Sequence, residues 1–368
     1  MEHGFTPIIR EVLSRNHGKK AASIFKQSLL VQYVNFKTRS ASKGAKSRSS
    51  YANLYVLYVL LEDYLQQGFA DSASNYANYE GAIFTDLLKR ARELPFGAKL
   101  QNHAFNSRLN DEFKKFFPTY DFLPVIRDYE TKRYWINENL LITKIGNKTV
   151  NIAQAVLEII DSYIKVKEES FSDFVNLCKK MQKVSRDNPS EITSYVQSLL
   201  NPHVDARIFE IVSYSILKQH FANASIFWGW NRKDLTKEQL TLYKTGRTNA
   251  NDGGIDFVMK PLGRFFQVTE TTDVKKYFLD IDKVQRYPIT FVIKTNDDIQ
   301  SLRDEIEKKA KKYYGVKKVV EKYMNCVEEI INIPILLHYL SKTVQQGKIA
   351  NVFHEIILQS EVEFNFGK

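Results

Sequence analysis

Apolar residues in the first third of the chain recur at helical spacing. They fall three or four residues apart in two clear runs, at Leu54, Leu57, Leu60, Leu61 and Leu65, and at Ile83, Leu87, Leu88 and Ala91. This spacing predicts a largely helical region up to about Lys132. Within it, residues 35–50 are rich in serine and cations and lack apolar periodicity, so we expect a mobile basic loop there.

Beyond Lys132 the pattern changes twice. Two β-prone runs, 140–145 and 149–152, flank the turn-forming pair Gly146-Asn147, which predicts a hairpin. Helical spacing then resumes to about Cys178. Residues 185–190 combine turn-forming residues with a proline, so we place the border between two domains there, giving residues 1–188 and 189–368.

The second half alternates between the two periods. A helix is expected at 204–221, β-prone runs at 225–230, 254–259 and 264–270, a helix near 274–285 and a strand at 289–294. The stretch between Trp230 and Tyr243 reads as a polar segment, and helices are expected at 298–313 and 328–339. The predicted class is mixed α/β (α+β), with a central mixed sheet flanked by helices in residues 189–368 and a largely helical domain before it.

Charge points to a polyanionic partner. The 368 residues carry a formal charge of +11 together with 13% aromatic residues, so the excess charge sits on a folded protein. A basic protein that binds nothing in particular is the plain alternative. Cys178 and Cys326 lie too far apart for a metal motif, which fits a reducing cytoplasm. The start resembles no secretory signal, and no apolar run is long enough to span a bilayer, so we expect no membrane association.

The candidate chemistry lies in residues 244–270. The turn Pro261-Leu262-Gly263 joins two β-prone runs, so Asp256 and Gln267 are expected to face one another on adjacent antiparallel strands. Asp256 stands between Ile255 and Phe257, and a carboxylate there is costly to bury without a partner. A divalent cation would stabilise it. Taken singly, Asp256 could instead cap a turn, and Gln267 could face solvent.

This arrangement resembles the PD-(D/E)XK nuclease superfamily, which includes many type II restriction endonucleases. In that family an aspartate at the start of one strand is followed, on the next strand, by an acidic residue or glutamine, any residue, and usually lysine. Asp256 and Gln267 match the first two places, whereas Thr269 occupies the place of the lysine. Lys260, Lys275 and Glu270 are the candidate replacements, although strand alternation turns Glu270 to the other face.

The family also tends to place a glutamate on the helix before the first strand. Glu210 lies in the expected helix and matches that place, although it could equally stand on an exposed face. The resemblance implies a restriction-endonuclease-like core and a Mg²⁺ ion held by oxygen ligands. These would be Asp256, the Val268 carbonyl and the Gln267 amide oxygen, while Glu210 would hold a second metal ion or a water.

The same resemblance implies double-stranded DNA as substrate and a homodimer on symmetric sites. The polar segment before Asp256 carries candidate base and phosphate contacts, and the basic loop carries candidate phosphate contacts. These residues are Lys244, Arg247, Asn249 and Asn251 in the first segment, and Lys37, Arg39, Lys43, Lys46 and Arg48 in the loop. An ordinary polar loop and a solvated linker are the alternatives.

Three other functions fit less well but stay open. A repair or junction nuclease with the same core would recognise DNA structure, a protein of the same fold without activity would only bind DNA, and a basic scaffold would bind it weakly through charge. No phosphate-binding loop of the ATPase type occurs. His103 and Asn106 lack the paired histidine that an HNH nuclease needs.

Overall fold

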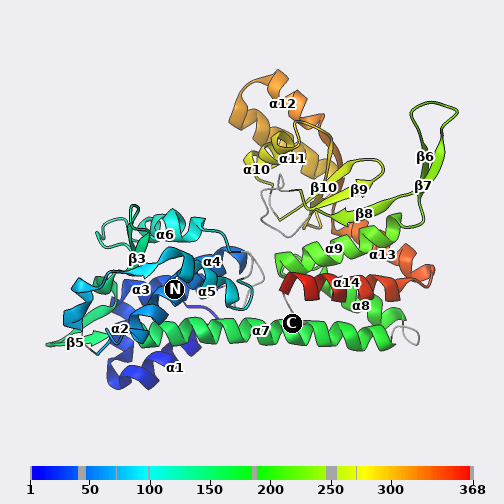
Figure 1. Ribbon diagram of the computed structural model, residues 1–368. Coiled ribbons are helices and arrows are strands. Elements are labelled where there is room, and N and C mark those ends of the chain that lie inside the picture. Colours follow the sequence, from blue (N-terminus) through cyan, green and yellow to red (C-terminus); the bar gives the residue numbers. More distant parts are fainter. Residues whose placement is uncertain are drawn as a thin grey trace. The chain divides into compact units, whose positions relative to one another are not determined.

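The computed structural model consists of two compact units, Met1–Asp173 and Phe174–Lys368 (Figure 1). It describes residues 2–39, 47–71, 73–97, 100–184, 189–245, 255–270 and 272–364. The units meet at Asp173, inside helix α7 (Ala153–Val184), whereas the sequence places the border near residue 188. Helical periodicity continues past Cys178, so α7 extends to Val184. The turn-forming residues that suggested the border come after it in the sequence.

The first unit is mainly helical, as the spacing of its apolar residues predicts. One large core gathers residues from most of its helices, among them Ile9, Leu30, Leu57 and Ile159. The helices before α7 are α1 (Thr6–His17), α2 (Ala21–Gln27), α3 (Leu29–Thr38), α4 (Ser47–Gln66), α5 (Phe84–Glu93) and α6 (Leu109–Phe116).

Two small sheets complete this unit. The expected hairpin is confirmed as β4 (Ile142–Ile145) and β5 (Lys148–Asn151). A three-stranded antiparallel sheet was not expected, since two of its strands lie in the region predicted to be helical. Its strands are β1 (Ala82–Ile83), β2 (Val125–Asp128) and β3 (Arg133–Ile136).

Both ends of the predicted basic loop are helical. Helix α3 continues through Lys37 to Thr38, and α4 begins at Ser47, so the prediction that residues 37 and 48 lie in a loop is wrong. Helix α3 extends beyond its apolar pattern because Val34, Lys37 and Thr38 are all buried, so packing against the core stabilises its last turn. Lys43 and Lys46 lie outside the described residues.

The second unit contains the predicted mixed sheet. Its five strands run in the order β12-β11-β10-β9-β8, antiparallel from β8 to β10 and parallel from β10 to β12. Residues 289–293 of β11 are all buried, as expected for a central parallel strand. The strands are β8 (Thr241–Lys244), β9 (Phe257–Lys260), β10 (Arg264–Thr269), β11 (Ile289–Ile293) and β12 (Val327–Ile331).

Helices cover both faces of this sheet (Figure 1). On one face Tyr214 of α9 packs against Phe257, their rings 5.1 Å apart, and α13 and α14 pack against α9. On the other face Tyr277 of α10 lies 4.4 Å from the ring of Phe291. These helices are α8 (Pro189–Leu199), α9 (Ala206–Phe221), α10 (Val274–Lys283), α11 (Ile299–Tyr314), α12 (Lys317–Met324), α13 (Ile333–Gln345) and α14 (Ile349–Phe364).

Three element predictions in this unit were wrong. The run 225–230 does not join the central sheet, because β6 (Ser225–Trp228) pairs with β7 (Thr236–Gln239) in a separate ribbon. The polar segment that follows contains β7 and β8. Residues 327–331 form a strand instead of part of a helix, because the side chain of Asn332 caps the start of α13 and separates the two elements.

Candidate active site

Asp256 lies immediately before β9, where the antiparallel pairing with β10 ends. Its N–H donates to the Phe266 carbonyl at 3.1 Å. Its carboxylate Oδ2 accepts from the Val268 N–H at 2.8 Å. A carboxylate oxygen therefore takes the position that a backbone carbonyl would hold if the ladder continued. This contact fixes the half-buried side chain beside β10, next to Gln267.

Gln267 is a second polar residue near the C-terminal end of β10. Its side chain is only 7% exposed, and its Nε2 makes a long, 3.5 Å contact with the Val268 carbonyl. Its Oε1 is buried and has no hydrogen-bond partner in the part of the chain that the structure describes. Buried polar atoms nearly always find a partner, so this oxygen needs an explanation.

The Val268 carbonyl points the same way. In a strand the N–H and C=O of one residue point to the same side, and those of the next residue point to the other. The Val268 N–H bonds Asp256, whereas the Thr269 carbonyl accepts from Lys294 beyond β11. The Asp256 carboxylate and the Gln267 amide thus both contact the main chain of Val268, near the C-terminal end of β10.

The sequence reasoning missed Lys276. Helix α10 begins at Val274, where Asp273 caps it by accepting from the Lys275 N–H at 3.1 Å. Its first turn brings the Lys276 ammonium to 3.3 Å from Oγ1 of Thr269, which is itself buried. A helix therefore supplies a cation at the place where the family pattern has a lysine. The signal available in the sequence was only that this lysine stands in the first turn after the strand.

The three replacements named from the sequence lie elsewhere. The Lys260 ammonium lies 6.0 Å from the ring of Tyr243, and that of Lys275 lies 4.4 Å from the ring of Tyr313. Glu270 accepts from Lys294 at 2.6 Å. The lysine that contacts Thr269 is therefore none of these candidates but Lys276 of α10.

Glu210 and Lys244 form an ion pair inside the second unit. The Lys244 ammonium lies 3.0 Å from Glu210 Oε1, and both side chains are mostly buried. The pair links α9 to β8 and neutralises both charges. From the sequence we predicted metal binding for Glu210 and phosphate contact for Lys244, whereas in the structure the two side chains form an ion pair with each other.

The remaining candidate DNA contacts divide into two groups. Lys37 is 5% exposed, and its ammonium contacts both carboxylate oxygens of Glu112, at 2.9 and 3.0 Å. We therefore withdraw it as a phosphate contact, because its charge is buried in an internal ion pair. Arg39 is exposed, and residue 48 belongs to α4. The candidate contacts outside the described residues are Lys43, Lys46, Arg247, Asn249 and Asn251.

The oxygen-bearing groups near the C-terminal end of β10 are of the kinds that bind a magnesium ion. It offers one carboxylate, one amide and one backbone carbonyl, and Mg²⁺ takes oxygen ligands while keeping several waters. The unpartnered Gln267 Oε1 is the atom that such an ion would satisfy. Among the described residues no three His, Cys, Asp or Glu side chains gather as a metal site, so a site here depends on the amide and the carbonyl.

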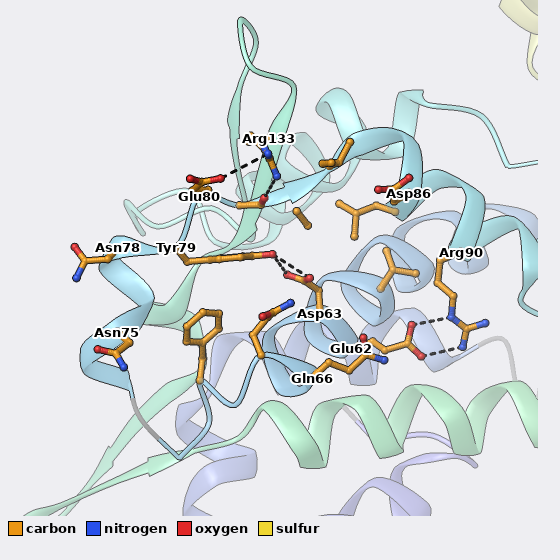
Figure 2. A pocket seen from close by; sticks show the side chains of 17 residues that line it. Glu62, Asp63, Gln66, Asn75, Asn78, Tyr79, Glu80, Asp86, Arg90 and Arg133 are labelled. Carbon is orange, nitrogen blue, oxygen red and sulfur yellow. Dashed lines mark hydrogen bonds and ion pairs between the residues drawn. The ribbon is translucent and has the colours of Figure 1, made fainter.

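The first unit holds a pocket of about 660 Å³ (Figure 2). Figure 2 shows two arginines at its rim, each facing a carboxylate, with Asp63 and Tyr79 between them. Arg90 binds Glu62 through two contacts of 2.7 and 2.8 Å. The Tyr79 hydroxyl lies 3.0 and 2.9 Å from the two Asp63 oxygens. Burial raises the pKa of Asp63, against the opposing effect of the Tyr79 hydrogen bond.

This pocket is acidic as a whole. Its lining contains four carboxylates and two arginines, namely Glu62, Asp63, Glu80, Asp86, Arg90 and Arg133. A surface of this sign repels phosphate. The pocket therefore does not suit a contact with DNA phosphates.

The chain matches no protein-family model, no curated protein and no solved structure. Within the described ranges, no helix is both long and apolar enough to cross a membrane.

Proposed function

We propose that this protein is a magnesium-dependent endonuclease of the restriction type that cleaves double-stranded DNA at a specific sequence. The observation that carries the proposal is the buried Gln267 Oε1, which has no hydrogen-bond partner among the described residues, on the same strand whose Val268 N–H binds the Asp256 carboxylate. The chain order α9, β8, β9, β10, α10, β11, with the β6–β7 ribbon inserted after α9, supports it. The net charge of +11 fits a polyanionic substrate.

The protein's share of the chemistry falls to four groups. Asp256, the Val268 carbonyl and Gln267 would hold the metal ion. When bound, Mg²⁺ neutralises charge on the reacting phosphate and lowers the pKa of a water. Lys276 sits at Thr269, where its ammonium can orient the attacking water and stabilise the developing negative charge. Hydrolysis of this kind leaves a 5′-phosphate and a 3′-hydroxyl.

Two properties belong to the same proposal. A symmetric recognition sequence calls for a homodimer in which each subunit cuts one strand. Both cysteines, Cys178 and Cys326, are free and buried, which suits a protein of the reducing cytoplasm.

The test compares wild-type protein with the Asp256→Asn variant on phage and plasmid DNA, in magnesium and in EDTA. Asparagine keeps an oxygen that accepts from the Val268 N–H but removes the charge, so the fold is expected to survive. The exposed Asp304→Asn is the matched control. We expect discrete bands that need magnesium, persist in Asp304→Asn and disappear in Asp256→Asn.

Other outcomes redirect the proposal. Wild-type rates in Asp256→Asn would exclude this residue as the metal ligand. If wild-type protein leaves a broad DNA panel intact but cuts branched junctions, it is a structure-specific nuclease. If it binds DNA and cuts neither substrate, it is a binding protein of the same fold.

A further inference from the structure

The β6–β7 ribbon stands out from the second unit (Figure 1). Its two strands pair only with each other, with Ser225 opposite Gln239 and Trp228 opposite Thr236. An N–H···O contact of 2.9 Å from Leu240 to Ala224 closes its base. All four residues of β7 are exposed. The ribbon is thus solvent-exposed along its length and available to a partner.

Large apolar side chains are displayed on this ribbon. Trp230 is 93% exposed and Phe227 is 67% exposed, while Trp228 and Leu235 are also exposed. Exposing so much aromatic surface in one small element is unfavourable in water, and such patches commonly mark interaction sites.

The acidic and basic side chains of the ribbon differ in whether they have partners within it. The Asp234 carboxylate is bound by the Asn231 amide, and Glu238 accepts from the Trp228 indole N–H at 2.6 Å. The side-chain cations of Arg232, Lys233 and Lys237 have no hydrogen-bond or ion-pair partner within the described ranges. The negative groups are therefore occupied within the ribbon, and the positive groups are left to an external partner.

The turn at the tip is built tightly. The Asp234 N–H donates to the Asn231 carbonyl at 3.1 Å, and the Asn231 side chain accepts from the Lys233 N–H at 3.2 Å. A Cβ on Gly229 would lie 2.4 Å from the Asp234 carbonyl oxygen, so only glycine fits there. This turn holds Trp230, Arg232 and Lys233 together at the end of the ribbon.

We propose that the β6–β7 ribbon is a duplex-DNA-binding element, with Trp230 against the base steps and Arg232 and Lys233 on the phosphates. A two-stranded ribbon can bind in the minor groove of a duplex, and apolar side chains that insert between base steps from that groove are a known way to hold it. A partner that binds these free cations carries negative charge, as DNA does. The inference rests on the proposed function only in taking DNA as the partner.

The test measures equilibrium binding of full-length protein to a fluorescein-labelled mixed-sequence duplex by anisotropy, in EDTA so that no cleavage occurs. The variants are Trp230→Ala and the double variant Arg232→Ala/Lys233→Ala. The control Lys317→Ala/Lys318→Ala removes the same charge from exposed positions of α12. Far-UV circular dichroism checks that each variant is folded.

We expect Trp230→Ala to weaken binding about tenfold or more, because the variant no longer buries the indole against the duplex. The ribbon double variant is expected to weaken it and to lower the slope of log K against log salt by about 2, because two phosphate contacts are lost. The α12 control should change neither quantity.

Equal affinity in wild-type protein and both ribbon variants would overturn the proposal, as would a wild-type protein that binds no duplex. A wild-type dimer that becomes a monomer in the ribbon variants, with DNA affinity unchanged, would assign the ribbon to a second copy of the chain instead. The proposed function is tested by a different measurement, since Asp256→Asn is expected to abolish cleavage while leaving the affinity for DNA unchanged.

Discussion

Replacing Gln267 with methionine tests the site through stability. The buried, unpartnered Oε1 costs about 1–3 kcal/mol, and methionine of similar length removes it. The variant loses the 3.5 Å contact from Nε2 to the Val268 carbonyl, which at that length is worth no more than about 0.5 kcal/mol. In EDTA we therefore expect Gln267→Met to be more stable than wild-type protein by about 1 kcal/mol. For a unit of this size that raises Tm by about 2–4 °C.

Magnesium should reverse this order. At ten times its Kd, an ion that binds only the folded state adds about 1.4 kcal/mol to wild-type protein, and it should add nothing to the variant if Gln267 is a ligand. Thermal melts with and without the ion measure both effects, with the exposed Gln239→Met as control. A variant that is less stable in EDTA, or one stabilised by magnesium as much as wild-type protein, would refute the reasoning.

Three further predictions concern other residues. Lys276→Met should lower kcat at least a hundredfold with little change in KM, whereas Lys275→Met should not; equal rates for the two variants in a plasmid cleavage assay would remove Lys276 from the mechanism. Glu112→Ala should destabilise the protein by about 3 kcal/mol in urea unfolding, because it leaves the buried Lys37 charge without its partner, and adding Lys37→Met should recover most of the loss. Burial raises the pKa of Asp63, so wild-type protein should match Asp63→Asn in stability below about pH 4 and fall behind it as pH rises through the folded-state pKa; an unchanged difference from acid to neutral pH would contradict this.

Local patterns predicted the two paired strands beside the candidate site correctly. The turn at Pro261-Leu262-Gly263 and the apolar runs beside it specify β9 and β10, since their signals lie within a few residues of each other. Residues 327–331 were misread, because a short run such as Val-Glu-Glu-Ile-Ile suits a strand or a helix, and its neighbour β11 decides between them.

Side-chain partners were not predictable in this way. The contact from Lys276 to Thr269 depends on how α10 folds back on the sheet. The burial of Lys37 against Glu112 joins residues 75 positions apart. Neither pair shares a local pattern, because both are set by packing between elements that are separated in the sequence.

The hydrogen bond from the Val268 N–H to Asp256 has a consequence for how this site can vary. Every amino acid except proline carries that N–H, and every one carries the carbonyl at the same position. The group that holds the Asp256 carboxylate in place therefore belongs to the main chain and not to a side chain. Position 268 should therefore accept any amino acid that packs there, except proline. A search for related sites should give little weight to the residue type at this position.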